Sequence, residues 1–481
     1  MKPDVLVIAP FRRPTFRKAI SPNYPICEPW DSAPLTAAGG LRQAGMEVRY
    51  LGLQNIFDGW QPDSDMDKLR NILGSHIPDI VVFSSDDYIP SRSTATLYGM
   101  RIVTSLVKSI NPRAKVIASG RLATVRSGRM FEDVPGLDHI FVGEWKEDAG
   151  TTLARLGKGN SIPAICSIGI PDTNHSLDSA PIPAWDLLPE SMNWYQKIHV
   201  GCDVNTNLSL RTSAGCKFRC RFCAGVPYWN NYRVKSPTRV DRELRLIKDS
   251  LGNKGRVCFL EDELFTRDPD HVASMASVFR THGILLDGLY THSSLLTDRV
   301  LADICDISRA VYLGLDNSND GVLRSMRKGQ TLSTVLNSIE RATNAGVAVH
   351  LEWIVGAPED TVETVLENIN AMYVLLSTGM VEGINTYVFC PHPGTDYAER
   401  PQQCELQITG ELDEMLENGG FPTGRTRGLS RQQVFVAYLI TQLMSQEVVS
   451  ARAHGYHFGS LTKPNLGELR TLLSHFAGKE N

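Results

Sequence analysis

Two series of alternating strand and helix patterns constrain the fold of this chain more than any other feature of its sequence. The first lies in residues 1–158, where helical patterns such as Leu35–Ala44 and Thr94–Ile110 separate short apolar runs. Five of these runs are predicted strands: Val5–Pro10, Glu47–Gly52, Asp79–Ser84, Lys115–Ser119 and His139–Val142. This order predicts a Rossmann-like domain with an open parallel α/β sheet, whose ligand lies beyond the carboxyl ends of the strands.

The second series fills residues 204–400 and contains six further strand patterns with helical patterns between them, such as Val362–Tyr373. The strands are expected at Leu208–Arg211, Arg256–Leu260, Gly288–His292, Ala310–Leu315, Ala348–Val355 and Ile384–Phe389. Six βα units predict a partial (β/α)6 barrel. The proline-rich residues 159–203 predict a linker. Residues 401–481 predict a small helical C-terminal region, in which Ser430 and Gln433 form a capping-box pattern.

Charge and hydropathy narrow the possible partners. The chain has 49 basic and 53 acidic residues, a net charge of -4, and no block of Lys and Arg, so a nucleic acid partner is not expected. The longest strongly apolar stretch, Val434–Ile440, is shorter than the ~18 residues that a membrane span needs. Lys2 and Asp4 lead straight into a strand pattern without a cleavage site. We therefore expect a cytoplasmic protein without a membrane partner.

Three of the ten cysteines lie within eight residues, in the sequence GCKFRCRFCAG directly after the first strand of the second series. Thiolates from Cys216, Cys220 and Cys223 can hold one face of a [4Fe-4S] cluster and leave one iron open for a small molecule. A zinc site is the alternative, with Cys202 or Cys258 as the fourth ligand. Three unrelated core cysteines are a further alternative.

The spacing CxxxCxxC, with Phe222 before the last cysteine, resembles the radical S-adenosylmethionine (SAM) superfamily. This resemblance implies a [4Fe-4S] cluster on the three cysteines, with the open iron chelating the methionyl amino and carboxylate groups of SAM. It also implies that Phe222 packs near the adenine and that one electron cleaves SAM to methionine and a 5′-deoxyadenosyl radical. An electron donor such as flavodoxin or ferredoxin is the expected protein partner.

A later segment of the second series extends the resemblance. HLEWIVGAPEDT is similar to the family pattern GxIxGxxE through Ile354, Gly356 and Glu359, although Glu352 stands where the first glycine is usual. The resemblance implies that these three residues contact SAM.

Acidic residues after two other strands are also candidate SAM ligands by this resemblance. Asp316 and Ser318 follow the fourth strand and could hydrogen-bond the ribose hydroxyls. Glu261 or Asp262, in FLEDELF, could bind the methionyl ammonium in place of the usual glutamate. The alternative for all these acids is a solvated loop residue.

An α/β domain ahead of such a barrel resembles the cobalamin-binding group of the superfamily. The implied corrinoid site lies where small residues end adjacent strands, and comprises Ser84, Ser85, Ser119, Gly120, Gly143 and Glu144. His76 and His139 are the histidines before residue 159, and neither lies in the DxHxxG motif that places histidine on cobalt. We therefore expect cobalt without a histidine ligand. A domain that kept the fold and lost the corrinoid is the alternative.

Several single residues of the second series have no motif around them. His292 and His350 lie in strand patterns, and Tyr387, Cys390 and His392 lie near its last strand, where they could line a substrate. Residues of these types in strands more often belong to the core.

The resemblance implies a cobalamin-dependent radical SAM methyltransferase that acts on an unactivated carbon of a small biosynthetic intermediate, as in antibiotic biosynthesis. The radical would take a hydrogen atom from the substrate, cobalamin would supply the methyl group, and a second SAM would remethylate cobalt. The nearest alternative is a ring rearrangement or cyclisation without methyl transfer. More distant alternatives are a tRNA methylthiotransferase, which has three further N-terminal cysteines where this chain has Cys27 alone, and a corrinoid or redox sensor.

Overall fold

The computed structural model describes residues 5–12, 29–57, 60–74, 77–85, 96–145, 147–157, 160–169, 176–204, 206–226, 231–409, 422–454 and 463–477. The chain divides into two compact units. Unit 1 comprises Met1–Gly215, Pro227–Glu263 and Arg280–Ile284, and unit 2 comprises Cys216–Val226, Leu264–Phe279 and Leu285–Asn481. The expected domain boundaries after residues 158, 203 and 400 stay a prediction.

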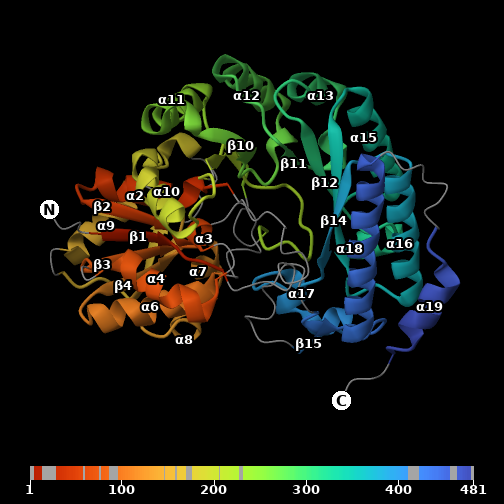
Figure 1. The fold of residues 1–481 in the computed structure, drawn as a ribbon, viewed down its shortest axis with the longest axis horizontal. Coiled ribbons are helices and arrows are strands. Elements are labelled where there is room, and N and C mark those ends of the chain that lie inside the picture. Colours follow the sequence, from red (N-terminus) through yellow and green to blue (C-terminus); the bar gives the residue numbers. More distant parts are fainter. Residues whose placement is uncertain are drawn as a thin grey trace. The chain divides into compact units, whose positions relative to one another are not determined.

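Unit 1 contains a six-stranded parallel sheet in the order β2-β1-β3-β4-β5-β6 (Figure 1). Its strands are β1 (Val5–Ala9), β2 (Val48–Gly52), β3 (Ile80–Ser84), β4 (Lys115–Ser119), β5 (His139–Gly143) and β6 (Ile165–Gly169). The helices α2 (Ser32–Gln43), α3 (Leu53–Ile56), α4 (Pro62–Leu73), α6 (Leu97–Ile110), α7 (Arg121–Val125), α8 (Met130–Asp133) and α9 (Glu147–Gly157) lie between the strands. The strand order reverses between β1 and β3, and sheets of this kind bind ligands at such a point.

Residues 159–203, expected to form a linker, contain two elements that the sequence analysis did not predict. Ile165–Gly169 forms β6, parallel to β5 at the edge of the sheet, and Leu188–Ile198 forms α10. An edge strand is covered on one side only, and in β6 buried Cys166 and Ile168 alternate with more exposed neighbours. Because this short alternating pattern contains no continuous apolar run and lies in a proline-rich stretch, the strand was not recognised from the sequence.

The rest of unit 1 begins the second series. Strand β7 (Asn207–Leu210) pairs in parallel with β10 (Arg256–Leu260), and β8 (Ser213–Ala214) pairs antiparallel with β9 (Arg233–Val234). Helix α11 (Pro237–Leu251) connects β9 to β10. Trp30 joins β7 through backbone hydrogen bonds to Asn207 and Ser209, of 2.8 and 3.0 Å, so the segment before α2 lies against this strand.

Unit 2 contains a four-stranded parallel sheet in the order β11-β12-β13-β14. The strands are β11 (Leu289–Thr291), β12 (Ala310–Asp316), β13 (Ala348–Val355) and β14 (Gly383–Val388), with helices α13 (Asp298–Ile304), α14 (Asp320–Ser325), α15 (Leu332–Asn344) and α16 (Val362–Ser377) between them. Helix α12 (Pro269–His282) precedes β11. All six predicted strands exist, and the α/β class is confirmed. Since they form one sheet of two strands and one of four, a single partial barrel stays a prediction.

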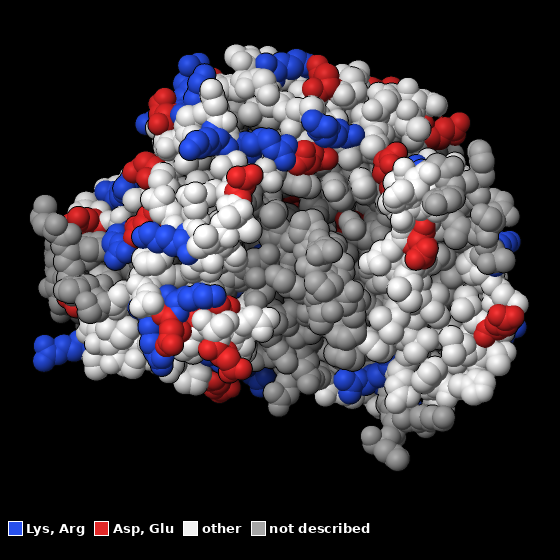
Figure 2. All heavy atoms as spheres, in the orientation of Figure 1, with Lys and Arg blue, Asp and Glu red and all other residues white. Residues whose placement is uncertain are grey.

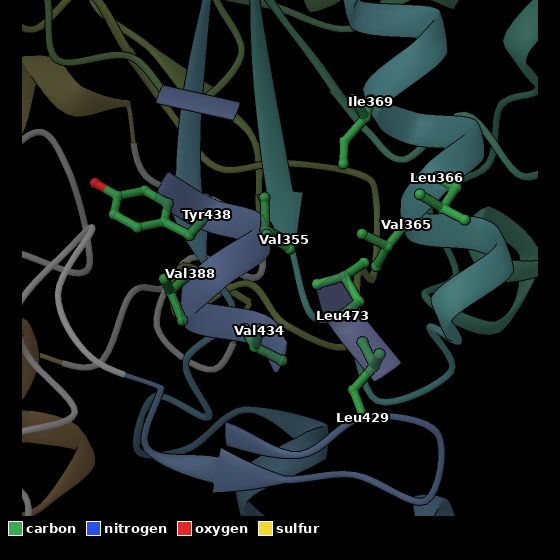
Figure 3. Packing of buried hydrophobic residues seen from close by; sticks show 10 residues of the cluster. Val355, Val365, Leu366, Ile369, Val388, Leu429, Val434, Tyr438 and Leu473 are labelled. Atoms are coloured by element: carbon green, nitrogen blue, oxygen red, sulfur yellow. The ribbon is translucent and has the colours of Figure 1, made fainter. Parts of the chain in front are cut away.

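One face of the β13–β14 pair carries the core of unit 2. Val355 and Val388 point toward α16 and toward α18 (Arg431–Ala453), where Val434 and Tyr438 meet them (Figure 3). Residues alternate along both strands, so the opposite face carries half-buried side chains, and Asn385 Nδ2 donates to Glu352 Oε1 there at 3.0 Å. The two faces of the β13–β14 pair therefore differ: one is buried and apolar, and the other is half-buried and carries both polar and apolar side chains.

The C-terminal region is mainly helical, as predicted. Helix α18 begins at a capping box in which Ser430 Oγ accepts from Gln433 N at 3.2 Å, and α19 (Leu466–Ser474) follows. A short antiparallel pair, β15 (Gln407–Ile408) with β16 (Gly424–Arg425), precedes it. By length and composition α18 could cross a membrane, and here one of its faces packs into the core of unit 2.

Candidate functional site

The three cysteines lie half-buried on one loop of unit 2, Cys216–Val226. A turn closes where Cys223 N donates to Cys220 O at 3.2 Å. Burial raises the pKa of the Cys220 thiol to about 12, the Lys328 ammonium lowers it, and the other two thiols raise it. The three sulfurs therefore share one electrostatic environment, in which a nearby cation favours thiolates.

The cluster assignment stays a prediction. Over the ranges that the structure describes, no set of three or more His, Cys, Asp or Glu side chains is placed so that it holds a metal ion directly. The donor chemistry fits an iron–sulfur cluster, because three thiols on one loop lie beside a buried cation. Of the proposed fourth ligands for zinc, Cys258 donates to Leu208 O within the β7–β10 pair at 3.5 Å, and Cys202 is exposed.

Arg221, between the second and third cysteines, anchors the loop. Its Nε donates to Asp396 Oδ2 at 2.7 Å, and its Nη1 donates to Glu359 Oε1 at 3.1 Å. The guanidinium lies 4.3 Å from the Tyr397 ring centroid, and Tyr397 Oη donates to Glu359 Oε2 at 2.8 Å. Arg221 holds the pKa of Asp396 below its usual range. Both oxygens of Glu359, the last residue of GxIxGxxE, therefore bind loop-anchoring side chains here.

Phe222 packs into an apolar cluster beside the loop, against Ile354, Val322, Met326 and Ala357. Phe222 and Ile354 are both predicted SAM contacts, and the structure brings them together. Because this surface is apolar, it suits the face of a purine ring. Their contact with SAM stays a prediction.

A buried ion pair lies next to the cysteines. Lys328 Nζ is 2.5 Å from Asp316 Oδ2, and both side chains are nearly inaccessible. A Cβ atom at Gly314 would lie 2.6 Å from Lys328 Nζ, so the glycine leaves the space that the ammonium occupies. The negative charges of Asp316 and of Cys220 raise the pKa of Lys328, which keeps the ammonium charged despite burial. Asp316 thus binds a protein cation in this structure.

Ser318 and the acids after β10 also have protein partners. Ser318 N and Oγ both donate to Asn368 Oδ1 at 2.7 Å. Glu261 accepts from Ser32 N and Ser32 Oγ at 2.5 and 2.7 Å, and burial raises the pKa of Asp262 to about 6. Asp262 itself accepts three hydrogen bonds of 2.6–2.7 Å from Thr212 and Ser213. The assignment of these acids to SAM stays a prediction.

A cavity of about 70 Å³ opens beside Glu261 within unit 1. Charged side chains of both signs line it: Glu144, Arg211, Lys235 and Glu261. Arg233 binds Glu144 through two bonds of 2.5 and 2.6 Å. The Glu144 carboxylate, expected at the corrinoid site, is therefore held by an arginine.

The row of small residues at the strand ends has one unsatisfied hydroxyl. Ser85 Oγ donates to Ser119 O at 2.9 Å, and Ser119 Oγ donates to Phe83 O at 2.8 Å. Ser84 Oγ is buried and has no hydrogen-bond partner among the described residues. A buried hydroxyl without a partner is costly unless a ligand satisfies it. Together with Gly120 and Gly143, this row fits a corrinoid tail, and the assignment stays a prediction.

His139 lies at the amino end of β5, the end opposite the row of small residues, and its Nδ1 lies 2.9 Å from Pro163 O. The absence of a histidine ligand to cobalt stays a prediction. His76 lies outside the described residues.

Three of the single residues of the second series, His292, Cys390 and His392, lie where burial disfavours their charged forms. His292 stacks on Phe218, with ring centroids 3.8 Å apart, and burial lowers the pKa of His292 to about 4. Cys390 Sγ lies 3.6 Å from His392 Nδ1, and burial lowers the pKa of His392 to about 4 while raising that of Cys390 to about 12. This pair therefore does not form a thiolate and an imidazolium.

Sequence reasoning missed the cations that surround these sites. Arg221 could have been noticed, because it lies inside the cysteine motif, but its partners Asp396 and Glu359 lie far away along the chain. Lys328 and Arg233 belong to no recognised motif, and their partners Asp316 and Glu144 are set by the fold, so no local pattern pointed to these ion pairs.

Known proteins resemble this chain over most of its length. An uncharacterized methyltransferase of Pyrococcus horikoshii is 23% identical over 439 residues, which cover 87% of this chain and 90% of that protein. The anaerobic magnesium-protoporphyrin IX monomethyl ester cyclase of Rubrivivax gelatinosus is 22% identical over 78% of this chain and 68% of its own length.

Solved structures share the fold. The radical SAM methyltransferase TsrM of Kitasatospora setae, solved with cobalamin and a [4Fe-4S] cluster bound, gives a TM-score of 0.62 at 15% identity, over 99% of this chain and all of that chain. The cobalamin-dependent SAM radical enzyme OxsB, with aqua-cobalamin and SAM bound, gives a TM-score of 0.63 at 13% identity, over 99% and 71% of the two chains.

The family comparison addresses the cysteine loop directly. Residues 210–372 match the model of the radical SAM superfamily, and this range contains the loop, β10 to β13 and the Lys328–Asp316 pair. The resemblance inferred from the motifs is therefore confirmed. Residues 210–372 form a radical SAM domain, and the chain resembles in fold the cobalamin-containing radical SAM proteins TsrM and OxsB.

Proposed function

We propose that this enzyme uses cobalamin, SAM and a [4Fe-4S] cluster to transfer a methyl group to an unactivated carbon of a small biosynthetic intermediate. One observation carries the proposal. Along the chain, a radical SAM domain with the three-cysteine loop follows a parallel sheet whose strand ends hold small residues. One of these is Ser84, whose buried hydroxyl has no hydrogen-bond partner among the described residues. The TsrM structure of similar fold contains cobalamin and a [4Fe-4S] cluster, and the OxsB structure contains aqua-cobalamin and SAM.

When bound, the cluster and SAM supply an organic radical and cobalamin supplies the methyl group. The chain positions these groups. Cys216, Cys220 and Cys223 offer thiolates, and Arg221 fixes their loop through Asp396 and Glu359. The Lys328 ammonium offsets the negative charge that thiolates bring into a buried site. An electron donor such as flavodoxin or ferredoxin would supply electrons.

The substrate is proposed to be a small molecule in a cytoplasmic pathway. TsrM has been solved with tryptophan as substrate. On the face drawn in Figure 2, Lys and Arg are interspersed with Asp and Glu, and this pattern does not form a continuous basic band for a nucleic acid. This supports a small substrate over the tRNA methylthiotransferase alternative.

A cyclisation without methyl transfer is the second candidate. The observation in its favour is the similarity to a magnesium-protoporphyrin IX monomethyl ester cyclase over 78% of this chain. A cyclase would need the radical chemistry of the cysteine loop and would not consume SAM as a methyl donor.

Product stoichiometry separates the two candidates. The reconstituted enzyme is incubated anaerobically with reductant, hydroxocobalamin and candidate substrates, and both nucleosides are quantified by mass spectrometry. A radical methyl transfer releases one 5′-deoxyadenosine and one S-adenosylhomocysteine per methylated product, because two SAM molecules serve two different steps. The two nucleosides should therefore accumulate in equal amounts.

Other ratios would contradict the proposal. Converted substrate with 5′-deoxyadenosine and no matching S-adenosylhomocysteine would favour cyclisation or rearrangement. S-adenosylhomocysteine alone would indicate a polar methyl transfer. The variant Cys220→Ala should lose 5′-deoxyadenosine, and it controls for background decay of SAM.

A further inference from the structure

We propose that Arg121 and Glu263 are positioning residues that connect the carboxyl end of β4, at the proposed corrinoid edge, to the residue before the first cluster cysteine. The inference rests on the proposed function and adds a route between its two cofactor sites. Arg121 Nη2 lies 2.6 Å from Glu263 Oε1, and Gly215 N donates to Glu263 Oε2 at 3.0 Å. The two side chains are 3% and 9% exposed.

The Arg121 end of this connection belongs to the edge of the first sheet. Arg121 follows Ser119 and Gly120 at the end of β4, and it begins α7. Within α7, Thr124 Oγ1 donates to Gly120 O at 2.8 Å and accepts from Gly143 N at 2.9 Å. Helix α7 therefore ties the ends of β4 and β5, two strands that carry predicted corrinoid residues, to one another.

The Gly215 end lies directly before Cys216. Gly215 has φ +97°, and a Cβ atom there would lie 2.1 Å from Asn231 O, so the backbone is fixed against its neighbour. The preceding residues are held in the same way, because Thr212 and Ser213 donate to Asp262. Successive carboxylates after β10 thus bind successive residues that lead into the cysteine loop.

Glu263 does more than pair with a cation. Its two oxygens bind two different segments, the arginine of α7 and the amide of Gly215. If either partner moves, a buried charge or a buried amide loses its bond, which is costly. A ligand that orders the end of β4 would therefore also order Gly215, and this dependence is reciprocal.

Hydrogen exchange of the full-length protein tests the connection first without any cofactor. In Arg121→Met and Glu263→Met the peptide that contains Gly215 should exchange at least about tenfold faster than in the wild type, because local opening becomes easier. Arg121→Lys keeps the charge and should restore slow exchange. Glu263→Gln keeps an oxygen that can accept from Gly215 N, and it replaces the Met variants in the experiment if these do not fold.

Glu243→Met is the matched control. Glu243 is also a buried carboxylate of unit 1, paired with Lys235 and Arg239 at 2.6 Å each. Its loss should destabilise the protein without faster exchange at Gly215. If Glu243→Met accelerates that peptide as much as Glu263→Met does, the effect is general destabilisation and the inference is overturned.

Addition of hydroxocobalamin then tests coupling, which a merely structural pair would not show. In the wild type the corrinoid should slow exchange of the Gly215 peptide, and in Arg121→Met it should bind without slowing it. If the wild type retains hydroxocobalamin and exchange at Gly215 does not respond, the inference fails and the proposed function stands. If the wild type retains none, the proposed function fails, and the cofactor-free exchange alone decides whether the pair positions Gly215.

Discussion

Buried ionisable side chains in unit 2 are each held in one protonation state by what surrounds them. Burial lowers the pKa of Lys328, but the nearby Asp316 and the cysteines raise it by more, so the ammonium stays charged. His271, His292 and His392 stay neutral, since burial lowers the pKa of each to about 4. The sequence shows neither state, because burial and neighbours are properties of the folded chain.

The neutral histidines make stability depend on pH. Between pH 6.5 and 4 an unfolded chain protonates its histidines and the folded chain does not, so the free energy of unfolding falls as the pH falls. Asp262 and Asp360 act in the opposite direction, because burial raises the pKa of each to about 6 and the folded chain then binds more protons.

We predict that His271→Gln weakens this pH dependence. The folded value of about 4 makes His271 responsible for about 2 kcal/mol of the stability lost between pH 8 and pH 5. Urea unfolding at pH 8 and pH 5 should show that the variant loses about 2 kcal/mol less of its free energy of unfolding than the wild type does. His475→Gln, at an exposed position, is the control and should lose as much as the wild type. Equal losses in His271→Gln and the wild type would contradict the prediction.

At the scale of elements, strand positions followed from the sequence, and their pairing did not. The six apolar runs of the second series are all strands, and the capping box at Ser430 does begin α18. Edge strand β6 was missed because only one of its sides is covered. Motif residues also acquired packing roles that periodicity cannot reveal, since these roles depend on elements distant in the sequence.

Gly356 shows such a role. The family pattern assigns it to SAM, and in the structure it faces α18: φ is +81°, and a Cβ atom would lie 2.5 Å from Val434 Cγ1. We predict that Gly356→Ala lowers the free energy of unfolding by about 2–4 kcal/mol, from backbone strain plus overpacking. Urea denaturation gives the value.

Gly346→Ala separates the two causes. Gly346 has a similar φ of +75° with nothing within 4 Å of the added Cβ, so it should cost only about 1 kcal/mol. In a double-mutant cycle, Val434→Ala should recover part of the loss in Gly356→Ala. Equal losses at the two glycines would mean that α18 does not press on Gly356.

The whole molecule joins two binding chemistries on one chain. The strand ends of unit 1 carry small residues and the buried hydroxyl of Ser84, and the loop of unit 2 carries thiols beside fixed charges. The motifs made the cofactors predictable. The ion pairs beside each site were not predictable from the sequence, because Arg221, Arg233 and Lys328 bind partners that lie from 12 to 175 residues away along the chain.

Because the two chemistries lie on different parts of the chain, each should be removable without the other. Ser84→Leu places a larger side chain at the end of β3, within the proposed corrinoid site. We predict that it lowers hydroxocobalamin retention while the iron content stays that of the wild type. It should still form 5′-deoxyadenosine under strong reductant and should lose both the methylated product and S-adenosylhomocysteine. Wild-type protein prepared without cobalamin should behave in the same way, and Cys220→Ala should lose 5′-deoxyadenosine as well.

Thr104→Leu controls for overpacking, because Thr104 is also buried in unit 1 and its hydroxyl has no hydrogen-bond partner among the described residues. It lies on α6, away from the strand ends, so it should retain cobalamin. Cobalt and iron are measured by elemental analysis, and the nucleosides by mass spectrometry. Full cobalamin retention in Ser84→Leu would mean that Ser84 does not contribute to the corrinoid site. A methylated product from cobalamin-free enzyme would refute the role of cobalamin, because SAM would then be the methyl donor to the substrate.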